Sequence, residues 1–201
     1  MALSKIQAES MNLADTFAFT GTVSGASSGL VKLLDATISS AVANYDIDST
    51  YINSTYDTYR LEFELMPADD GKYVNIRVIV GGAVQSSGSY YGTEAMPTDG
   101  GTTYNSNTGN SAHRLTGYTI GNADGEGITG IIEMKNINST TFPFQYMGYT
   151  VTHHNSSGNH YGNACTGSVR PANRGDVVNG IRFFFSQGNI ASGRVKLYGI
   201  T

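Results

Sequence analysis

Strict alternation of apolar and polar side chains in two consecutive segments is the strongest constraint on the fold. Every second position is apolar in residues 59–65 and again in residues 74–80, with Arg, Glu and Asn among the positions between. Successive side chains of a strand point to opposite faces, so each segment predicts a strand of an antiparallel sheet with one apolar and one wet face. The linker 67–72 has Pro early and Gly late, as a tight turn prefers. We therefore predict a hairpin, with Arg77 among Glu62 and Glu64.

The C-terminus repeats this arrangement. Residues 181–185 and 194–200 have strand-like alternation, and Ser186-Gln187-Gly188-Asn189 between them supplies turn residues that tolerate positive φ. A chain that ends inside a strand holds its terminus by ladder hydrogen bonds. These residues predict a second hairpin, central to the sheet.

Short strand-like segments recur at turn-bounded intervals along the rest of the chain. Gly numbers 25 and charged residues are only 14% of the chain, a composition that favours many turns over long helices. The prediction is an all-β protein, an antiparallel β-sandwich of the jelly-roll type over residues 30–201. Residues 39–43 fit either a strand or a helical turn. The further predicted strands are residues 30–36, 38–47, 114–120, 128–136, 141–152 and 163–169.

Residues 1–25 are predicted to be an N-terminal extension, joined to the sandwich by a flexible segment at 26–29. Leu13 precedes a segment in which Phe17, Phe19 and Val23 lie on one side of a short strand without a partner hairpin. An exposed strand edge has unpaired backbone N–H and C=O groups that can pair with another chain. The segment is expected to dock onto another subunit or particle; the alternative is that it folds back on its own domain.

Two polar segments are candidate binding loops. Residues 81–114 contain Tyr90, Tyr91 and Tyr104 among Gly, Ser, Thr and Asn, and apart from a possible short strand at 87–91 they are loop-like. Long loops of this composition are adaptable contact surfaces, although solvated loop or subunit packing explains them equally well. The second loop contains four ring side chains, His153, His154, His160 and Tyr161. Three imidazoles in eight positions suggest zinc or nickel, but their spacing follows no metal motif, so a binding loop is the preferred interpretation.

The sequence argues against several classes of function. A net charge of −4 with scattered cations gives no nucleic-acid footprint, and no apolar run is long enough to span a membrane. Cys165 is the single cysteine and is expected to be a small buried apolar residue. The G-x-G-x-x-G of residues 125–130 is followed by a strand pattern instead of a helix, which argues against a dinucleotide cofactor. Catalytic motifs are missing, so we predict no enzyme and no cofactor.

Both ends of the chain resemble virion surface proteins of tailed bacteriophages. At the C-terminus the resemblance lies in Gly180-Ile181-Arg182-Phe183, Gly188-Asn189-Ile190, Ser192-Gly193 and Leu197-Tyr198-Gly199-Ile200. Near the start, residues 13–23 are similar to segments that precede such modules. These proteins are tail-fibre, head-fibre and capsid-decoration modules.

The resemblance implies a structural role at the virion surface for a protein made in the bacterial host cytoplasm. It further implies a homotrimer that contacts other virion proteins through residues 1–25. A fibre-type module would present its loops to a host-surface glycan or protein. The alternative is a decoration or cement protein that stabilises the capsid by protein–protein contacts.

Overall fold

The computed structural model describes residues 29–87, 90–98, 101–156, 159–169 and 176–201, and these residues form an all-β sandwich without a helix. The predicted anchor residues Leu13, Phe17, Phe19 and Val23 lie outside the described residues. The strands are β1 (Leu30–Ile38), β2 (Tyr45–Ile47), β3 (Thr58–Pro67), β4 (Val74–Val80), β5 (Ala83–Val84), β6 (Tyr90–Thr98), β7 (Gly101–Asn110), β8 (His113–Arg114), β9 (Ile128–Lys135), β10 (Gln145–His153), β11 (His160–Val169), β12 (Val178–Phe185) and β13 (Ile190–Ile200).

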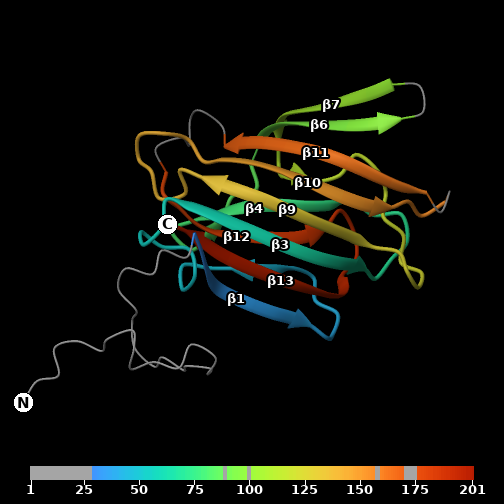
Figure 1. Cartoon of the computed structure of the whole chain (residues 1–201), viewed down its shortest axis with the longest axis horizontal. Helices are drawn as coiled ribbons and strands as arrows, with labels where there is room; N and C mark the ends of the chain where they lie inside the picture. Colours follow the sequence, from blue (N-terminus) through green and yellow to red (C-terminus); the bar gives the residue numbers. More distant parts are fainter. Residues whose placement is uncertain (1–28, 88–89, 99–100, 157–158, 170–175) are drawn as a thin grey trace, which may run out of the picture.

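The strands form two antiparallel sheets that pack face to face (Figure 1). The large sheet has eight strands in the order β1-β13-β3-β9-β10-β11-β6-β7, and the small sheet has the order β2-β12-β4-β5, with β8 also paired to β4. The structure confirms the predicted antiparallel sandwich. A jelly-roll connectivity stays a prediction.

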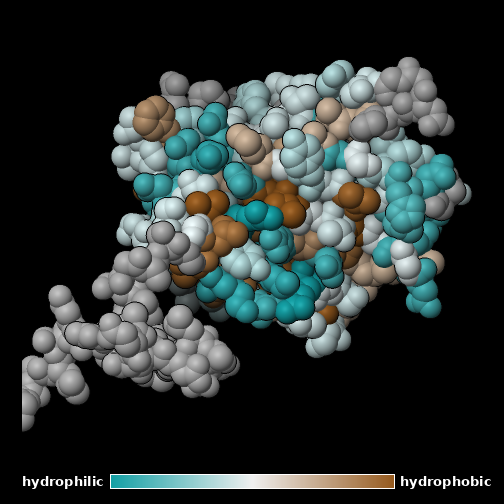
Figure 2. Space-filling model, viewed as in Figure 1, coloured by the Kyte–Doolittle hydropathy of each residue, from teal (hydrophilic) through white to brown (hydrophobic). Residues whose placement is uncertain are grey.

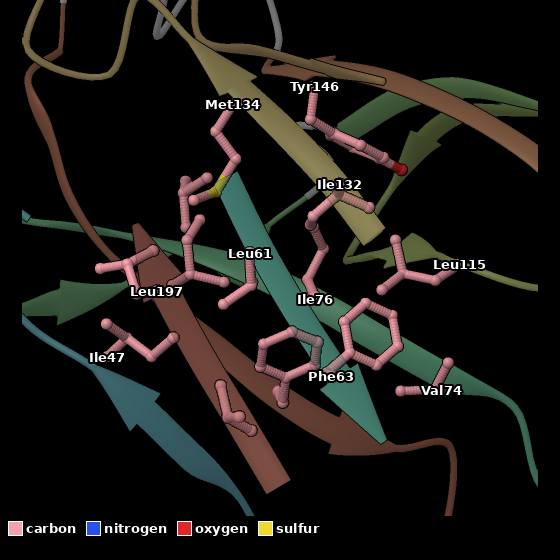
Figure 3. Packing of buried hydrophobic residues seen from close by; sticks show 14 of the residues in the cluster. Ile47, Leu61, Phe63, Val74, Ile76, Leu115, Ile132, Met134, Tyr146 and Leu197 are labelled. Atoms are coloured by element: carbon pink, nitrogen blue, oxygen red, sulfur yellow. The ribbon is translucent and has the colours of Figure 1, made fainter. Parts of the chain in front are cut away.

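The core lies between the two sheets and is built from the apolar positions of each alternating segment (Figure 3). Leu197, Leu61 and Ile132 form one row across β13, β3 and β9 and are fully buried. Ile76 and Ile47 of the small sheet lie opposite them. Complete burial of one such side chain contributes about 1.5–3 kcal/mol, so this row fixes which face of the large sheet points inward.

Both predicted hairpins are wrong in their pairing, although their strands exist. β3 belongs to the large sheet and β4 to the small one, and β12 and β13 are divided in the same way. Alternation requires only that each apolar face be covered, and here the opposite sheet supplies the cover. The two sheet-crossing turns lie together, since Ala68 N donates to Asn189 O at 2.9 Å and Ser186 N to Tyr73 O at 2.8 Å.

The predicted position of Arg77 is also wrong. Its register partner in the neighbouring strand is Arg182, and its guanidinium lies 4.5 Å from the centre of the Phe184 ring. Its Nε donates to Ser111 O at 2.8 Å. Arg77 therefore lies on the outer face of the small sheet, and the glutamates of β3 lie on the large sheet.

The segment 81–114 is largely extended, where the sequence predicted a long loop. β6 and β7 form a hairpin at the edge of the large sheet, and β5 and β8 join the small sheet. β7, GTTYNSNTGN, is polar on both faces, so it lacks the alternation that identifies a half-buried strand. Residues 114–120 are the opposite case, because a predicted strand is reduced there to β8 and an isolated bridge at Ile120.

Two smaller predictions are settled by the same strands. Residues 39–43 contain no helical turn, and Val42 forms an isolated bridge with Ile190. The G-x-G-x-x-G segment leads into β9, as expected, with φ +83° at Gly125 and +119° at Gly127.

Candidate functional site

The outer face of the large sheet is divided into a charged half and an uncharged half. The charged half lies on β1, β13 and β3, where Arg194 makes a bidentate ion pair with Asp35 through distances of 2.8 and 3.0 Å. This pairing lowers the pKa of Asp35 to about 2. Lys196 and Glu62 continue the alternation of sign across the neighbouring strands. The charges of this half are therefore largely satisfied by one another.

The other half of the outer face consists of three cross-strand rows on β10, β11, β6 and β7. The first row is Tyr149, Ala164, Ala95 and Tyr104. The second row is Met147, Thr166, Thr93 and Ser106, and the third is Gln145, Ser168, Tyr91 and Thr108. We call these twelve residues the uncharged face, because none of them is Asp, Glu, Lys or Arg.

The same division is visible on the surface. In Figure 2 hydrophilic residues gather over β3 and β13, whereas the atoms over β10 and β11 are mostly pale or brown. Tyr149 and Tyr104 are among the most exposed large side chains, at 75% and 69%, and Met147 is 51% exposed. An exposed group of aromatic and apolar side chains on an otherwise polar protein marks a candidate interaction surface.

Two adjoining depressions follow the uncharged face. One, of about 450 Å³, is lined by Thr93, Ser106, Thr108 and Gln145 among others. The second, of about 410 Å³, is more apolar and lies beside Tyr149 and Ile131 of β9. Met147 and Thr166 line both depressions, so the two lie next to each other.

The underside of this face is supported by a buried histidine. His113 of β8 packs edge-on against the rings of Tyr90 and Tyr146, each at 4.9 Å, and its Nε2 lies 3.1 Å from Ser168 O. Burial lowers the pKa of His113 to about 4. The paired glycines Gly92 and Gly167 make room for the ring, since an added Cβ on Gly167 would lie 2.4 Å from His113 Cε1.

Cys165 also lies on the inner side of these strands, opposite Glu94 of β6. It is fully buried, as predicted for a small apolar residue. Burial, followed by the nearby Glu94, raises the pKa of its thiol to about 12. A thiol that is protonated at neutral pH and enclosed in the core has no access to a substrate.

The predicted tyrosines separate into two groups. Tyr91 and Tyr104 lie on the uncharged face, on strands instead of loops. The prediction of a surface role is wrong for Tyr90, which is fully buried. Its hydroxyl accepts from Val78 N at 2.9 Å and donates to Gln85 O at 2.7 Å, and burial raises its pKa to about 12. Tyr90 joins the two sheets.

The predicted His-rich loop is the end of the β10–β11 hairpin. His153 and His160 are register partners with ring centres 3.3 Å apart. They lie at the margin of a further depression of about 500 Å³, which also contacts Glu64 and Glu126. Within the described residues no group of three or more His, Cys, Asp or Glu side chains has the geometry to hold a metal ion.

His154 and Tyr161 form a separate aromatic cluster with Tyr118. The Tyr118 and Tyr161 rings stack at 3.8 Å, and the His154 ring lies edge-on to both at 6.0 and 5.7 Å. This cluster secures the segment that follows β8 against the β10–β11 hairpin. The four ring residues of the predicted loop thus divide between two places in the fold.

Sequence reasoning missed the largest contributors to the uncharged face, Met147 and Tyr149. They belong to the segment QYMGYTVTH, which is apolar at successive positions and was assigned only as a strand. A strand with apolar side chains on both faces requires cover on both sides. That signal, present in the sequence, identifies Met147 and Tyr149 as candidates for contact.

Comparison with protein-family models, curated proteins and solved structures finds no match. No helix in the described part of the chain is long and apolar enough to cross a membrane.

Proposed function

We propose that this chain is a non-enzymatic virion surface protein of a tailed bacteriophage, a fibre-type module that uses its uncharged face for attachment to the host. The observation that carries the proposal is the uncharged face itself, a continuous surface of three rows with exposed Tyr149 and Tyr104. The bacteriophage assignment is supported by the resemblance of the chain ends to such modules.

The position of the face suits a contact with a large partner. The rows lie on strands held by backbone ladders, so the backbone that carries these side chains is already fixed before a partner arrives. Preorganisation of this kind lowers the entropic cost of binding. In this proposal the protein is a homotrimer, and residues 1–25 connect it to other virion proteins.

A capsid-decoration role is the second candidate. It is favoured by the exposed apolar side chains along the boundary of the face, namely Ile131, Met147 and Val151, which are 40%, 51% and 50% exposed. Apolar groups of this kind are typical of the cores of protein–protein interfaces. In that role the face would be covered in the assembled particle.

Immunogold electron microscopy of intact particles, with antibody raised against the full chain, tests both roles. Gold at the tail or at fibre tips is expected for attachment. Gold over the capsid alone would favour decoration or a head fibre, and the absence of gold from particles would refute the virion assignment.

Competition for host cells tests the face. The full chain added in excess should reduce particle adsorption, and Thr166→Lys at the centre of the face should remove this effect. Thr37→Lys, on exposed β1 of the same sheet, is the matched control and should compete normally. Equal competition by both variants would refute attachment through this face.

A further inference from the structure

We propose that the uncharged face binds a neutral oligosaccharide, laid across β10, β11, β6 and β7. This inference rests on the proposed function in taking the face as the binding surface, and it adds the chemical class of the ligand. Three features of the face support this ligand: the side chains of the first row, the hydroxyl groups of the rows beside it, and the absence of charge among its twelve residues.

The first row combines two highly exposed tyrosines with two half-buried alanines. Tyr149 and Tyr104 stand at its ends, and the methyl groups of Ala164 and Ala95 form the floor between them. The two tyrosines are three strand spacings apart, which is about 14 Å. The face of an aromatic ring is electronegative and attracts the polarised C–H groups that line one face of a sugar ring. Two such rings separated by a low floor suit a short chain of sugars better than a single one.

The neighbouring rows present neutral groups that both donate and accept hydrogen bonds. Thr166, Thr93 and Ser106 follow each other across three strands, and Ser106 Oγ lies 3.4 Å from Thr108 Oγ1 in the next row. Each hydroxyl supplies one donor and two acceptor positions, as do the hydroxyls of a sugar. The depression of about 450 Å³ over these residues leaves room for such groups above the sheet.

The charges in and around the face disfavour acidic ligands over its first two rows. The twelve residues include no cation that could pair with a carboxylate, sulfate or phosphate. Two charged residues of β9 border the face: Glu133, the register partner of Met147, which lines the second depression, and Lys135, the register partner of Gln145. An anionic group over the first two rows would lose hydration without gaining a partner and would be repelled by Glu133, since Lys135 lies only at the end of the third row. Uronate-containing, sialylated and sulfated glycans, and nucleic acids, are therefore disfavoured.

The composition also favours a glycan over a protein surface. Protein interfaces concentrate their energy in large buried anchors at the centre of the contact. The centre of this face consists instead of Ala164, Ala95, Thr166 and Thr93, with its aromatic rings at the periphery. Small side chains between aromatic walls can hold a slender polar chain but offer little area to a protein anchor.

Binding of the full chain to an array of neutral oligosaccharides and of oligosaccharides bearing uronate, sialic acid or sulfate tests the proposal. We expect binding to at least one neutral class, with Kd nearly unchanged between about 0.05 and 0.5 M NaCl, because no ion pair contributes. Tyr149→Ala should weaken binding roughly tenfold. Tyr198→Ala, half-buried in the charged half of the same sheet, is the matched control and should not change Kd.

Three outcomes of the array experiment would overturn the inference: no binding to any oligosaccharide, binding confined to acidic ones with steep salt dependence, or equal loss in the Tyr149 and Tyr198 variants. Binding to host envelopes that protease treatment abolishes would identify a protein partner and would also overturn it. These failures are distinguishable from failure of the proposed function. If one of these outcomes is found while particles carry gold label and the full chain blocks adsorption, attachment stands and only the neutral glycan is excluded.

Discussion

Replacing Phe183 with alanine should cost about 3–5 kcal/mol of unfolding free energy. Phe183 is fully buried in β12, and its ring centre lies 5.1 Å from that of Phe63, which comes from the opposite sheet. Alanine removes the transfer free energy of the ring, leaves a cavity between the sheets and abolishes an aromatic contact worth about 0.5–1.5 kcal/mol. The backbone of β12 is paired on both sides, to β2 and β4, so it cannot move inward to fill the space.

Phe184 is the matched control, because it is the next residue of the same strand and points to the opposite face. Its ring lies under Arg77, a contact worth about 0.5–1 kcal/mol where it is exposed, so Phe184→Ala should cost about 1 kcal/mol or less. Urea unfolding of the full chain, followed by circular dichroism and by tyrosine fluorescence, measures both losses. Similar losses in the two variants would refute the register of β12, because a slip of one residue exchanges the faces of the two rings.

Three further measurements examine the support beneath the uncharged face. Burial lowers the pKa of His113 from its ordinary 6.5 to about 4, so the unfolded chain binds a proton in this range that the folded chain excludes. The contribution of neutral His113 to the unfolding free energy should be complete above pH 6.5 and should fall by roughly 3 kcal/mol as the pH drops toward 4. His113→Gln should remove this pH dependence of stability. The same pH dependence in the variant would contradict the assignment to His113. Gly167→Ala should lower the unfolding free energy by about 1–3 kcal/mol, because its Cβ would meet His113 and Tyr146. Gly162→Ala has open space around it and should change the unfolding free energy by no more than about 0.5 kcal/mol. Equal losses in the two variants would contradict the assignment of Gly167 to the inner side of β11. Iodoacetamide should modify Cys165 only as fast as the chain unfolds, because the buried thiol has a pKa of about 12, and rapid labelling of the folded chain would contradict its burial.

The fold class was predictable because alternation is a local property with a single physical meaning. A segment such as residues 59–65 buries every second side chain whichever strand it pairs with. Pairing is not local, and the sequence contains no signal that distinguishes a hairpin from a crossing between sheets when the connection is as long as residues 68–73. Both connections assigned as hairpins therefore came out as crossings, each with the correct strands on either side.

The candidate site was only partly predictable, for a related reason. The composition of residues 81–114 identifies Tyr91 and Tyr104 as candidates. It identifies Tyr90 as well, because the sequence alone does not show which of two adjacent tyrosines is buried. In a strand, however, neighbours face opposite sides, and the register irregularity between Tyr90 and Tyr91 separates them further. Met147 and Tyr149 are missed when a one-sided sheet is assumed. Only the strand order places Tyr149 in one row with Tyr104, and Met147 in the row beside it.

The two halves of the outer face of the large sheet differ in the side chains that they present to solvent. On β1, β13 and β3 the outer charges alternate in sign along a row, so they satisfy one another and keep that surface hydrated. On β10, β11, β6 and β7 the same positions hold hydroxyl, methyl and aromatic groups, which need no counter-charge. β7 is an edge strand, and edges of soluble sheets are commonly protected by charge. The β6–β7 hairpin has no charged side chain on its outer face and therefore lacks this protection. Its absence is consistent with a surface that binds a partner.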